Sequence, residues 1–181
     1  MLLLVWKAFW GGLGANPVEV ITHNTGEWAL RFLLIMLIIS PLRKWTGLGS
    51  WLKFRRMLGL YSFFYGFCHF LVWFIADHSA DVSAMIEDVI ERPYITFGFL
   101  ALVIMIPLAV TSNKWMVRVL ARRWNQLHKL TYAVVVLGIL HYLWLVKADY
   151  LEAGIYAVLA TGLLSLRYFQ SSPRRTVGQS T

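Results

Sequence analysis

The sequence predicts an all-α integral membrane protein, a helical bundle of five full spans preceded by a truncated N-terminal span. Of its 181 residues, 59% are hydrophobic and the mean hydropathy is +0.61, whereas soluble domains are usually about 45 to 50% apolar. Long apolar runs recur along the chain, and a spanning helix needs roughly 20 apolar residues. The charge of the connecting segments also alternates in sign. These three observations indicate a multi-pass protein of the bilayer.

Five apolar runs are the candidate spans. The first, 28–42, contains Arg31 and crosses only with flanking residues such as Trp45. The later runs carry charge only near their ends, at 57–76, 93–111, 130–146 and 150–169. The opening 1–10 is too short to cross a bilayer and lacks the features of a signal peptide. We interpret it as the end of a further helix.

The spans form one domain, residues 1–170, followed by a short polar tail, 171–181. No internal repeat or second domain is evident. The connections give the orientation, because cytoplasmic loops carry the excess of Lys and Arg. The basic residues include Arg43, Lys44, Lys53, Arg55, Arg56, Lys114, Arg118, Arg122 and Arg123, and the acidic connection holds Asp77, Asp81, Glu87, Asp88 and Glu91. This pattern places 11–27 and the acidic connection outside, and the C-terminus in the cytoplasm.

Two histidines are predicted at one depth in the membrane. His69 lies eight residues before the outer Asp77, roughly 12 Å below the surface, and His141 lies roughly 9 to 12 Å below it. Helical stripes of small residues accompany both: Ser62 and Gly66 precede His69, and Gly138 precedes His141. A haem placed edge-on between two helices, with one histidine on each side of the iron, fits this pattern. The alternative is that the stripes only allow close helix packing.

His128 lies thirteen residues before His141, about 20 Å further toward the cytoplasm and on a different helix face. It is either a ligand of a second, inner haem or an interfacial histidine near Trp124. His23 and His78 are expected in outer loops, exposed to solvent.

Several motifs resemble the haem-binding membrane subunit of the bacterial periplasmic methionine sulfoxide reductase system. They are "RRMLGL" before His69, "RPYITFG", "LAVTSN", "WNQLHKLTY" and "HYLWLVK". That subunit belongs to the ferric reductase-like transmembrane group, and the resemblance covers nearly the whole chain from Gly11 onward. It implies a six-span haem domain over 1–170, with His69 and His141 at ligand positions and His128 at the family's third histidine.

The resemblance also implies a function. Such subunits lie in the bacterial inner membrane and take electrons from the quinone pool or a cytosolic flavin reductase. They pass them to a periplasmic molybdopterin-containing subunit that repairs oxidised methionines. The implied cofactors are one or two haems b, with FMN and quinone as further candidates. Catalysis takes place in the partner, and the chain itself is an electron-transfer subunit.

Cationic residues suggest two further roles. Arg31 and Arg92 lie near the outer surface and are candidates for binding haem propionates, although Arg31 could instead pair with Glu27 at i, i+4. The basic face of Arg55, Arg56, Arg122 and Arg123 is either the positive-inside signal itself or a docking surface for an electron donor.

Other functional classes fit less well. A transporter or proton relay would also use buried histidines, but it usually needs carboxylates within the membrane, and no predicted span has one at its centre. No serine lies in a GxSxG elbow, which argues against an intramembrane protease. The motif "GGLG" at Gly11 follows no strand, which argues against a nicotinamide-binding domain. Cys68 is the single cysteine and cannot form an internal disulfide. The net charge of +8 follows membrane topology and lipid contact, and indicates no nucleic-acid partner.

Overall fold

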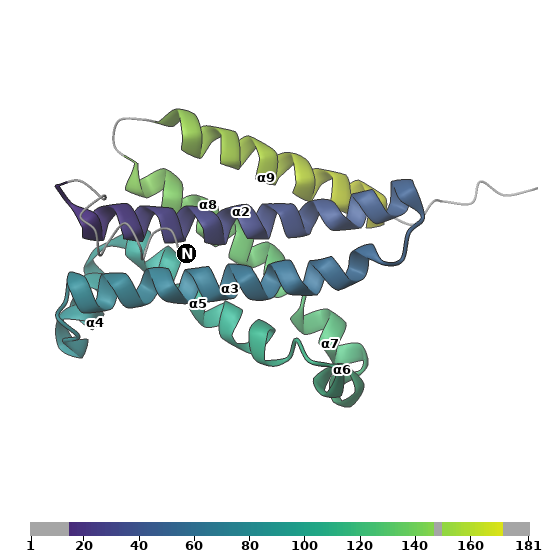
Figure 1. Ribbon diagram of the computed structural model, residues 1–181, viewed down its shortest axis with the longest axis horizontal. Coiled ribbons are helices and arrows are strands. Elements are labelled where there is room, and N and C mark those ends of the chain that lie inside the picture. The colour runs from purple at the N-terminus through teal and green to yellow at the C-terminus, as the bar shows by residue number, and fades with distance from the viewer. Residues whose placement is uncertain (1–14, 147–149, 172–181) are drawn as a thin grey trace, which may run out of the picture.

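A computed structural model describes residues 15–146 and 150–171, which form a helical bundle (Figure 1). The predicted stub 1–10, the junction 147–149 and the tail beyond Ser171 lie outside these described residues. In chain order the helices are α2 (Pro17–Thr46), α3 (Trp51–Ala76), α4 (Val82–Glu91), α5 (Pro93–Val110), α6 (Lys114–Leu120), α7 (Arg122–Leu127), α8 (Leu130–Leu145) and α9 (Tyr150–Ser171). Among the described residues there is no strand, so the all-α class is confirmed.

Helix α2 begins much earlier than the apolar run predicted. The segment 11–27 was expected to be an outer loop, but from Pro17 onward it is helical. Asn16 caps the helix, because its side chain accepts a hydrogen bond from the Glu19 backbone N–H, and Pro17 occupies the first turn, where its missing N–H costs nothing. Polar residues therefore extend α2 beyond the apolar run.

Four segments of the described chain are long and apolar enough to cross a membrane. They are Pro17–Thr46, Trp51–Ala76, Pro93–Val110 and Arg122–Leu145, the last comprising α7 and α8. Helix α9 is not among them, and it carries Glu152 and Arg167 near its ends. A multi-pass membrane protein is therefore supported, whereas the predicted number of five full spans plus a truncated one is not confirmed.

The helices pack as two neighbouring pairs, with α2 along α3 and α5 along α8, and α9 covers α2 and α8. The centre of the bundle is a small apolar core that includes Leu37, Val134 and Val135, each at most 1% exposed. Many large apolar side chains, such as Phe64 on α3 and Val103 on α5, are instead exposed on the surface. An apolar exterior of this kind suits contact with lipid, since it would be an aggregation hazard in water.

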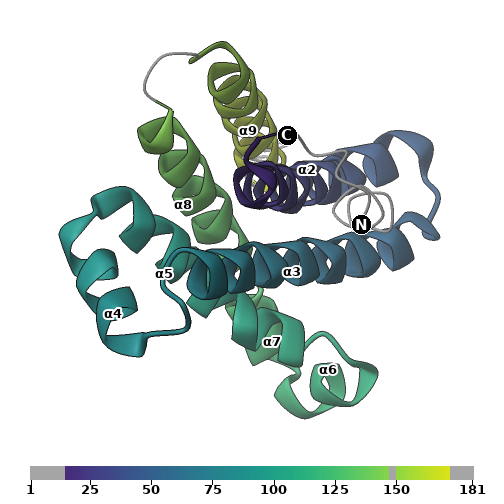
Figure 2. The ribbon, with the colours of Figure 1, turned by 60° about the vertical axis from the view of Figure 1, so that its left-hand side comes forward.

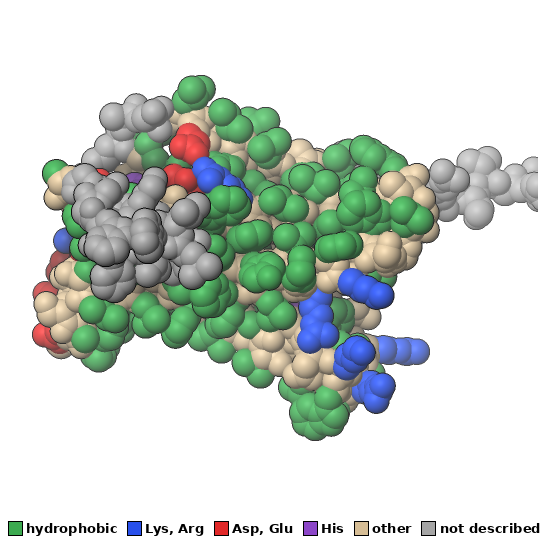
Figure 3. Space-filling view, in the orientation of Figure 1, with side chains coloured by type: hydrophobic (Ala, Val, Ile, Leu, Met, Phe, Trp, Pro, Cys, Tyr) green, Lys and Arg blue, Asp and Glu red, His purple; other side chains and the backbone are tan. Residues whose placement is uncertain are grey.

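The two ends of the bundle differ in charge. Asp77, Asp81, Glu87, Asp88 and Glu91 lie around α4 at the acidic end, and Arg55, Arg56, Arg118, Arg122 and Arg123 lie at the basic end; Figure 3 shows these groups on opposite sides. Helix α4 lies beside α5 at the edge of the bundle, and α6 and α7 project from the basic end (Figure 2). This separation agrees with the alternating charge of the sequence.

Candidate functional site

A cavity of about 760 Å³ lies among α2, α3, α5 and α8 toward the acidic end. His69 of α3 and His141 of α8 both line it, together with apolar side chains such as Leu33, Phe99 and Met105. Polar groups line its outer part, among them Glu19, His23, Asp77, His78, Asp88 and Arg92. The cavity is therefore apolar in its depth and polar at its mouth, as a site for an amphipathic cofactor requires.

The two histidines predicted at one depth lie next to each other. Their ring centroids are 6.0 Å apart and the ring planes make an angle of 79°. This contact agrees with the prediction that the two histidines lie level, because both helices are regular α-helices and residue counts translate into height along them. Side chains 72 positions apart in the sequence thus form one pair.

Each imidazole is held by a backbone carbonyl of the neighbouring helix. His69 Nδ1 lies 2.9 Å from the Thr22 oxygen of α2, and His141 Nδ1 lies 2.7 Å from the Tyr94 oxygen of α5. A carbonyl can only accept, so each Nδ1 carries the proton and each Nε2 keeps its lone pair. No described residue forms a hydrogen bond with either Nε2. Both histidines are thus prepared as metal ligands through Nε2, with the second nitrogen fixed as in many metal sites.

The donor set fits haem better than a bare metal ion. A metal–imidazole bond is about 2 Å long, so two Nε2 atoms on opposite sides of one ion place the ring centroids roughly 6 Å apart. The observed centroid separation of 6.0 Å is compatible with such an arrangement. Among the described residues, no group of three or more His, Cys, Asp or Glu could hold a metal ion. Two protein ligands suffice for haem iron, because the macrocycle supplies the other four.

Gly66 and Gly138, expected beside the cofactor, both line the cavity. A Cβ at Gly66 would lie 3.9 Å from Ala29, and one at Gly138 would lie 3.8 Å from Leu30, so neither glycine is required for helix packing. Their missing side chains leave room in the cavity itself. This placement is consistent with the predicted haem-packing role, which stays a prediction.

Two other glycines were missed by the sequence analysis. A Cβ at Gly26 would lie 3.1 Å from His69 Nδ1, and one at Gly98 would lie 2.8 Å from His141 Nδ1. At Gly98 an added Cβ would displace the His141 ring, and at Gly26 it would lie tightly against the His69 ring. The glycine of "RPYITFG" was quoted as part of a motif, but nothing in its spacing pointed to contact with a ring on another helix.

Ser62 has a different position from the one expected. It is fully buried, does not line the cavity, and donates a hydrogen bond of 2.7 Å to the Ala29 carbonyl. The hydroxyl therefore joins α3 to α2. Ser62 and Gly66 share one helical stripe, but Ser62 contacts α2 and Gly66 lines the cavity. Helical periodicity alone could not distinguish these two surroundings.

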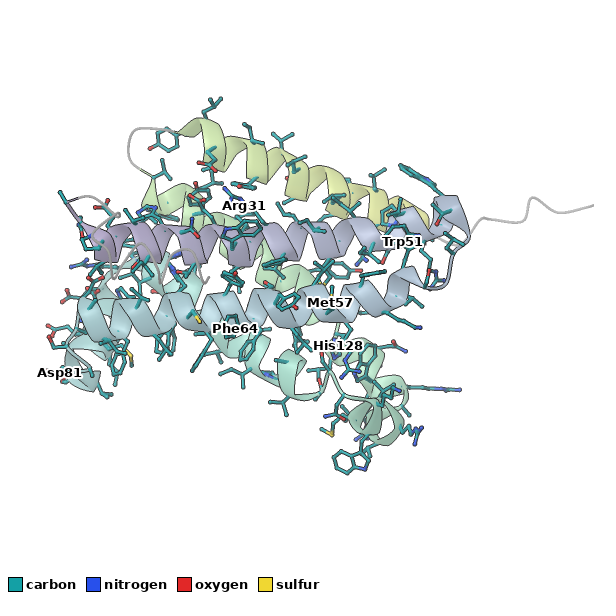
Figure 4. All side chains as sticks on the ribbon, in the orientation of Figure 1. Arg31, Trp51, Met57, Phe64, Asp81 and His128 are labelled. Carbon is teal, nitrogen blue, oxygen red and sulfur yellow. The ribbon has the colours of Figure 1, made fainter. Side chains whose placement is uncertain are left out.

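Arg31 does not line the cavity but joins α2 to α9 (Figure 4). Its guanidinium donates to the Tyr156 hydroxyl at 2.7 Å, to Glu27 at 2.8 Å and to Glu152 at 3.4 Å. The pairing with Glu27 considered from the sequence is present. With its charge balanced by two carboxylates, Arg31 is a poor partner for a propionate.

Arg92 lines the cavity mouth and pairs with Asp88, whose Oδ1 lies 2.7 Å from Nε. The Tyr94 hydroxyl, 3.5 Å from Nη1, and the charge of Asp88 raise the pKa of Arg92 above its ordinary value. Its side chain is 56% exposed, which leaves it room to turn toward an anionic group in the cavity. Of the two arginines proposed from the sequence, Arg92 alone borders the cavity.

His23 and His78 also line the mouth of the cavity. His23 is exposed as expected, but His78 is not: its side chain is only 12% exposed, it packs edge-on against Trp73, and Nε2 lies 3.2 Å from Asp88 Oδ2. The solvent-exposed prediction for His78 is therefore wrong. Helix α4 folds back over the end of α3 and covers the ring, which a loop prediction could not anticipate.

His128 lies between α7 and α8 near the basic end, remote from Asp81 at the acidic end (Figure 4). Its ring stacks on Trp124 at 3.9 Å between centroids, and Nε2 lies 3.1 Å from Thr111 Oγ1. That hydroxyl also donates to the Pro107 carbonyl, so it accepts from His128 Nε2. His128 Nε2 is therefore already engaged in a hydrogen bond within the protein.

The four arginines proposed for donor docking all lie at the basic end. Arg55 is half-buried on α3, whereas Arg56 on α3 and Arg122 and Arg123 on α7 are exposed (Figure 3). Helices α6 and α7 meet at Ala121, which has a φ of 45°. This turn ends α6 and lets α7 begin with its two arginines on the surface.

The chain matches the family described as "Ferric reductase like transmembrane component" over residues 25–139. It is 51% identical over 157 residues to a protein of Ralstonia nicotianae named "Protein-methionine-sulfoxide reductase heme-binding subunit MsrQ", a match that covers 85% of this chain and 72% of that protein. Proteins of the same name from Brucella anthropi and Xanthomonas euvesicatoria pv. vesicatoria are 43% and 45% identical, over 91% and 96% of this chain and 74% and 82% of their own lengths.

No solved structure matches the chain significantly. The family match spans α3 and α5 whole and includes His69 and His128, and the alignments with the relatives extend over most of the chain. The chain therefore belongs to the ferric reductase-like transmembrane family, in the group of haem-binding subunits of protein-methionine-sulfoxide reductases.

Proposed function

We propose that this protein transfers electrons through the membrane by way of a b-type haem whose iron is bound by His69 and His141. One observation carries the proposal: two imidazoles, 6.0 Å apart in a cavity, have Nδ1 fixed by carbonyls and Nε2 free. The relatives' printed name, heme-binding subunit, supports the same cofactor. Haem iron supplies a centre that gains and loses one electron at a time.

The chain's own residues would bind and orient the cofactor. Gly66 and Gly138 leave space for the macrocycle, and the apolar depth of the cavity keeps water from it. Arg92 at the mouth is the candidate partner for a propionate, since a guanidinium binds a carboxylate with two parallel hydrogen bonds. His128 is kept as a candidate ligand only for a second haem at the basic end.

The proposed topology follows the charge of the two ends. The basic end faces the cytoplasm of a bacterium with the C-terminus on that side, and the acidic end faces the periplasm, because positive residues accumulate on the cytoplasmic side of the inner membrane. The haem would then lie near the periplasmic surface. The acceptor on that side is a molybdopterin-containing methionine sulfoxide reductase, in which the catalytic chemistry takes place.

The proposed donor is quinol or a cytosolic flavin reductase, with FMN as a candidate further cofactor. Arg55, Arg56, Arg122 and Arg123 give the basic end a positive potential that would attract an acidic flavoprotein or a flavin phosphate. Such steering weakens with salt, since the Debye length is about 8 Å at physiological ionic strength. Donor-dependent reduction that slows with added salt would support docking there.

The proposal is tested by absorption spectra of the purified protein from haem-replete cells, oxidised and dithionite-reduced, with haem quantified per chain. The wild type should show sharp reduced bands of low-spin haem b, and His69→Ala and His141→Ala should each lose them. His23→Ala is the comparison variant, because His23 lines the same cavity and is not proposed as a ligand of the iron.

A colourless wild type would overturn the proposal. So would variants of His69 and His141 that keep the spectrum of the wild type. In His128→Ala, the haem count distinguishes one haem from two: an unchanged count assigns the cofactor to the outer pair alone, and a halved count assigns a second haem to the basic end.

A further inference from the structure

The surroundings of His69 and His141 repeat at a fixed distance in the sequence. Thr22 and Tyr94, Gly26 and Gly98, Gly66 and Gly138, and His69 and His141 are each 72 positions apart. In both sets the residue that supplies the carbonyl precedes the histidine by 47 residues. The glycine that contacts the ring, Gly26 or Gly98, follows that residue by four. The α2–α3 pair and the α5–α8 pair are thus two copies of one arrangement. This repeat was not evident from composition or hydropathy.

In each copy a carbonyl and a glycine on one helix face a single ring on the other. The carbonyl fixes Nδ1, at 2.9 Å for His69 and 2.7 Å for His141. The glycine lies one helical turn away, on the same face as the carbonyl's residue, and leaves the ring its space. A hydrogen bond restricts the rotation of the imidazole, and the helix surface at the glycine limits its tilt.

The fit is tighter at Gly98 than at Gly26. An added Cβ at Gly98 would lie 2.8 to 3.1 Å from three atoms of the His141 ring, and one at Gly26 would lie 3.1 Å from two atoms of the His69 ring. Contacts below 3.0 Å force a displacement. Glycine in the middle of a helix is less favourable than alanine, so its presence at both positions needs a reason.

From this geometry we infer that Gly26 and Gly98 are positioning residues, which set the orientation of the two imidazole planes and keep Nδ1 bonded to the carbonyl. The inference rests on the proposed binding of one haem by His69 and His141. It adds two residues outside the ligand set that would control the electronic properties of the iron. The present angle between the planes is 79°, close to perpendicular.

Two measurable properties depend on that orientation. In ferric bis-histidine haem, crossed ligand planes give a strongly anisotropic electron paramagnetic resonance signal with one dominant low-field feature, whereas parallel planes give a three-line rhombic signal. A hydrogen bond from Nδ1–H to a carbonyl makes the imidazole a stronger donor, which favours ferric iron and lowers the reduction potential. Displacing the ring should therefore change the signal and raise the potential.

The test compares Gly98→Ala and Gly26→Ala with Gly154→Ala and Gly162→Ala in the full chain. The control glycines lie on α9, where an added Cβ would meet nothing within 4 Å. Each protein is studied by electron paramagnetic resonance of the oxidised form and by redox titration of the haem band. We expect the dominant feature to shift toward the rhombic signal and the potential to rise, more in Gly98→Ala than in Gly26→Ala, with both controls unchanged.

Every outcome of this test either supports or overturns the inference. If Gly98→Ala loses its haem but keeps wild-type helix content by circular dichroism, the positioning role is supported, and the milder Gly26→Ala supplies the spectral shift. A rhombic signal in the wild type, or variants that match the α9 controls in both signal and potential, would overturn the inference while leaving haem binding intact. A wild type without haem would instead overturn the proposed function on which the inference rests.

Discussion

The acidic and basic ends of the bundle hold histidines in opposite chemical states. At the acidic end, His69 and His141 donate through Nδ1 to carbonyls and present free Nε2 atoms to a cavity. At the basic end, His128 uses Nε2 for a hydrogen bond to Thr111 and stacks its ring on Trp124. His69 and His141 lie within apolar helices, whereas His128 follows the last residue of α7. What distinguishes them is which ring nitrogen the neighbouring helix leaves free.

On the proposed assignment of the ligands, the difference means that an intramembrane histidine alone does not indicate a ligand. The decisive feature is an acceptor for Nδ1 on the adjacent helix, which fixes the tautomer before any metal binds. A backbone carbonyl serves this purpose without a special side chain. This is why the anchor at Thr22 and Tyr94 leaves little trace in the residue types of the sequence.

The strongest test of the contrast between the two ends is the loss of a proposed ligand at the acidic end, for which we expect the largest effect. In His69→Ala the low-spin haem spectrum should disappear, and millimolar imidazole added to the membranes should restore it, because the truncated side chain leaves a hole of the size of the ligand. In His128→Ala imidazole should have no such effect on the outer haem. Recovery in neither ligand variant, His69→Ala or His141→Ala, would contradict the assignment of the pair.

A smaller effect is expected at the basic end from Thr111→Val, which removes the hydroxyl and keeps the shape. Because His128 Nε2 then loses its acceptor in a half-buried position, unfolding should become easier by about 1 to 2 kcal/mol. Thermal unfolding in detergent measures this change, and the haem content should stay that of the wild type. A drop in haem content would show that the basic end also takes part in binding the cofactor.

The sequence was sufficient for the part of the fold that depends on hydropathy and regular helices. The positions of α3, α5, α8 and α9 agree with the predicted runs to within a few residues at most ends, and the level placement of the two histidines follows from helical rise. The early start of α2 was missed because it depends on the cap at Asn16 and Pro17, and hydropathy does not register capping.

The site was predictable only as far as residue type carries the information. Histidines with small neighbours indicate a cofactor, but contacts between helices decide what each neighbour does. Ser62 bonds to α2, Arg31 pairs with carboxylates, and Gly26 and Gly98 face the rings. None of these contacts follows from the periodicity of a single helix.

Ser62→Ala gives an intermediate prediction that separates packing from cofactor binding. The hydroxyl is fully buried between α2 and α3, so its loss should destabilise the protein by about 1 kcal/mol. Because Ser62 does not line the cavity, the haem content and reduction potential should not change. A measurable shift in potential would return Ser62 to the haem-packing group in which the sequence placed it.

The smallest expected effect distinguishes the two arginines of the acidic end. Arg92→Gln should lower the haem potential by an amount equivalent to less than about 1 kcal/mol, because a partly exposed charge next to a propionate is screened by water. Arg31→Gln should change the potential less than Arg92→Gln does, since Arg31 does not line the cavity. Redox titration of both variants checks the pair, and equal shifts would contradict the role given to Arg92.

The cavity lies nearer the acidic end of the bundle than the basic end, and this position has a consequence for energy coupling. In the proposed orientation, an electron that enters from the cytoplasm crosses the larger part of the bilayer before it reaches the His69–His141 pair, since His69 lies eight residues from Asp77 and thirteen from Arg56. The membrane potential is negative inside, so it drives a negative charge outward, by about 2.3 kcal/mol per 100 mV for a full crossing. Methionine repair in the periplasm would then draw directly on the energised state of the membrane, and an uncoupler would slow it even with the donor fully reduced.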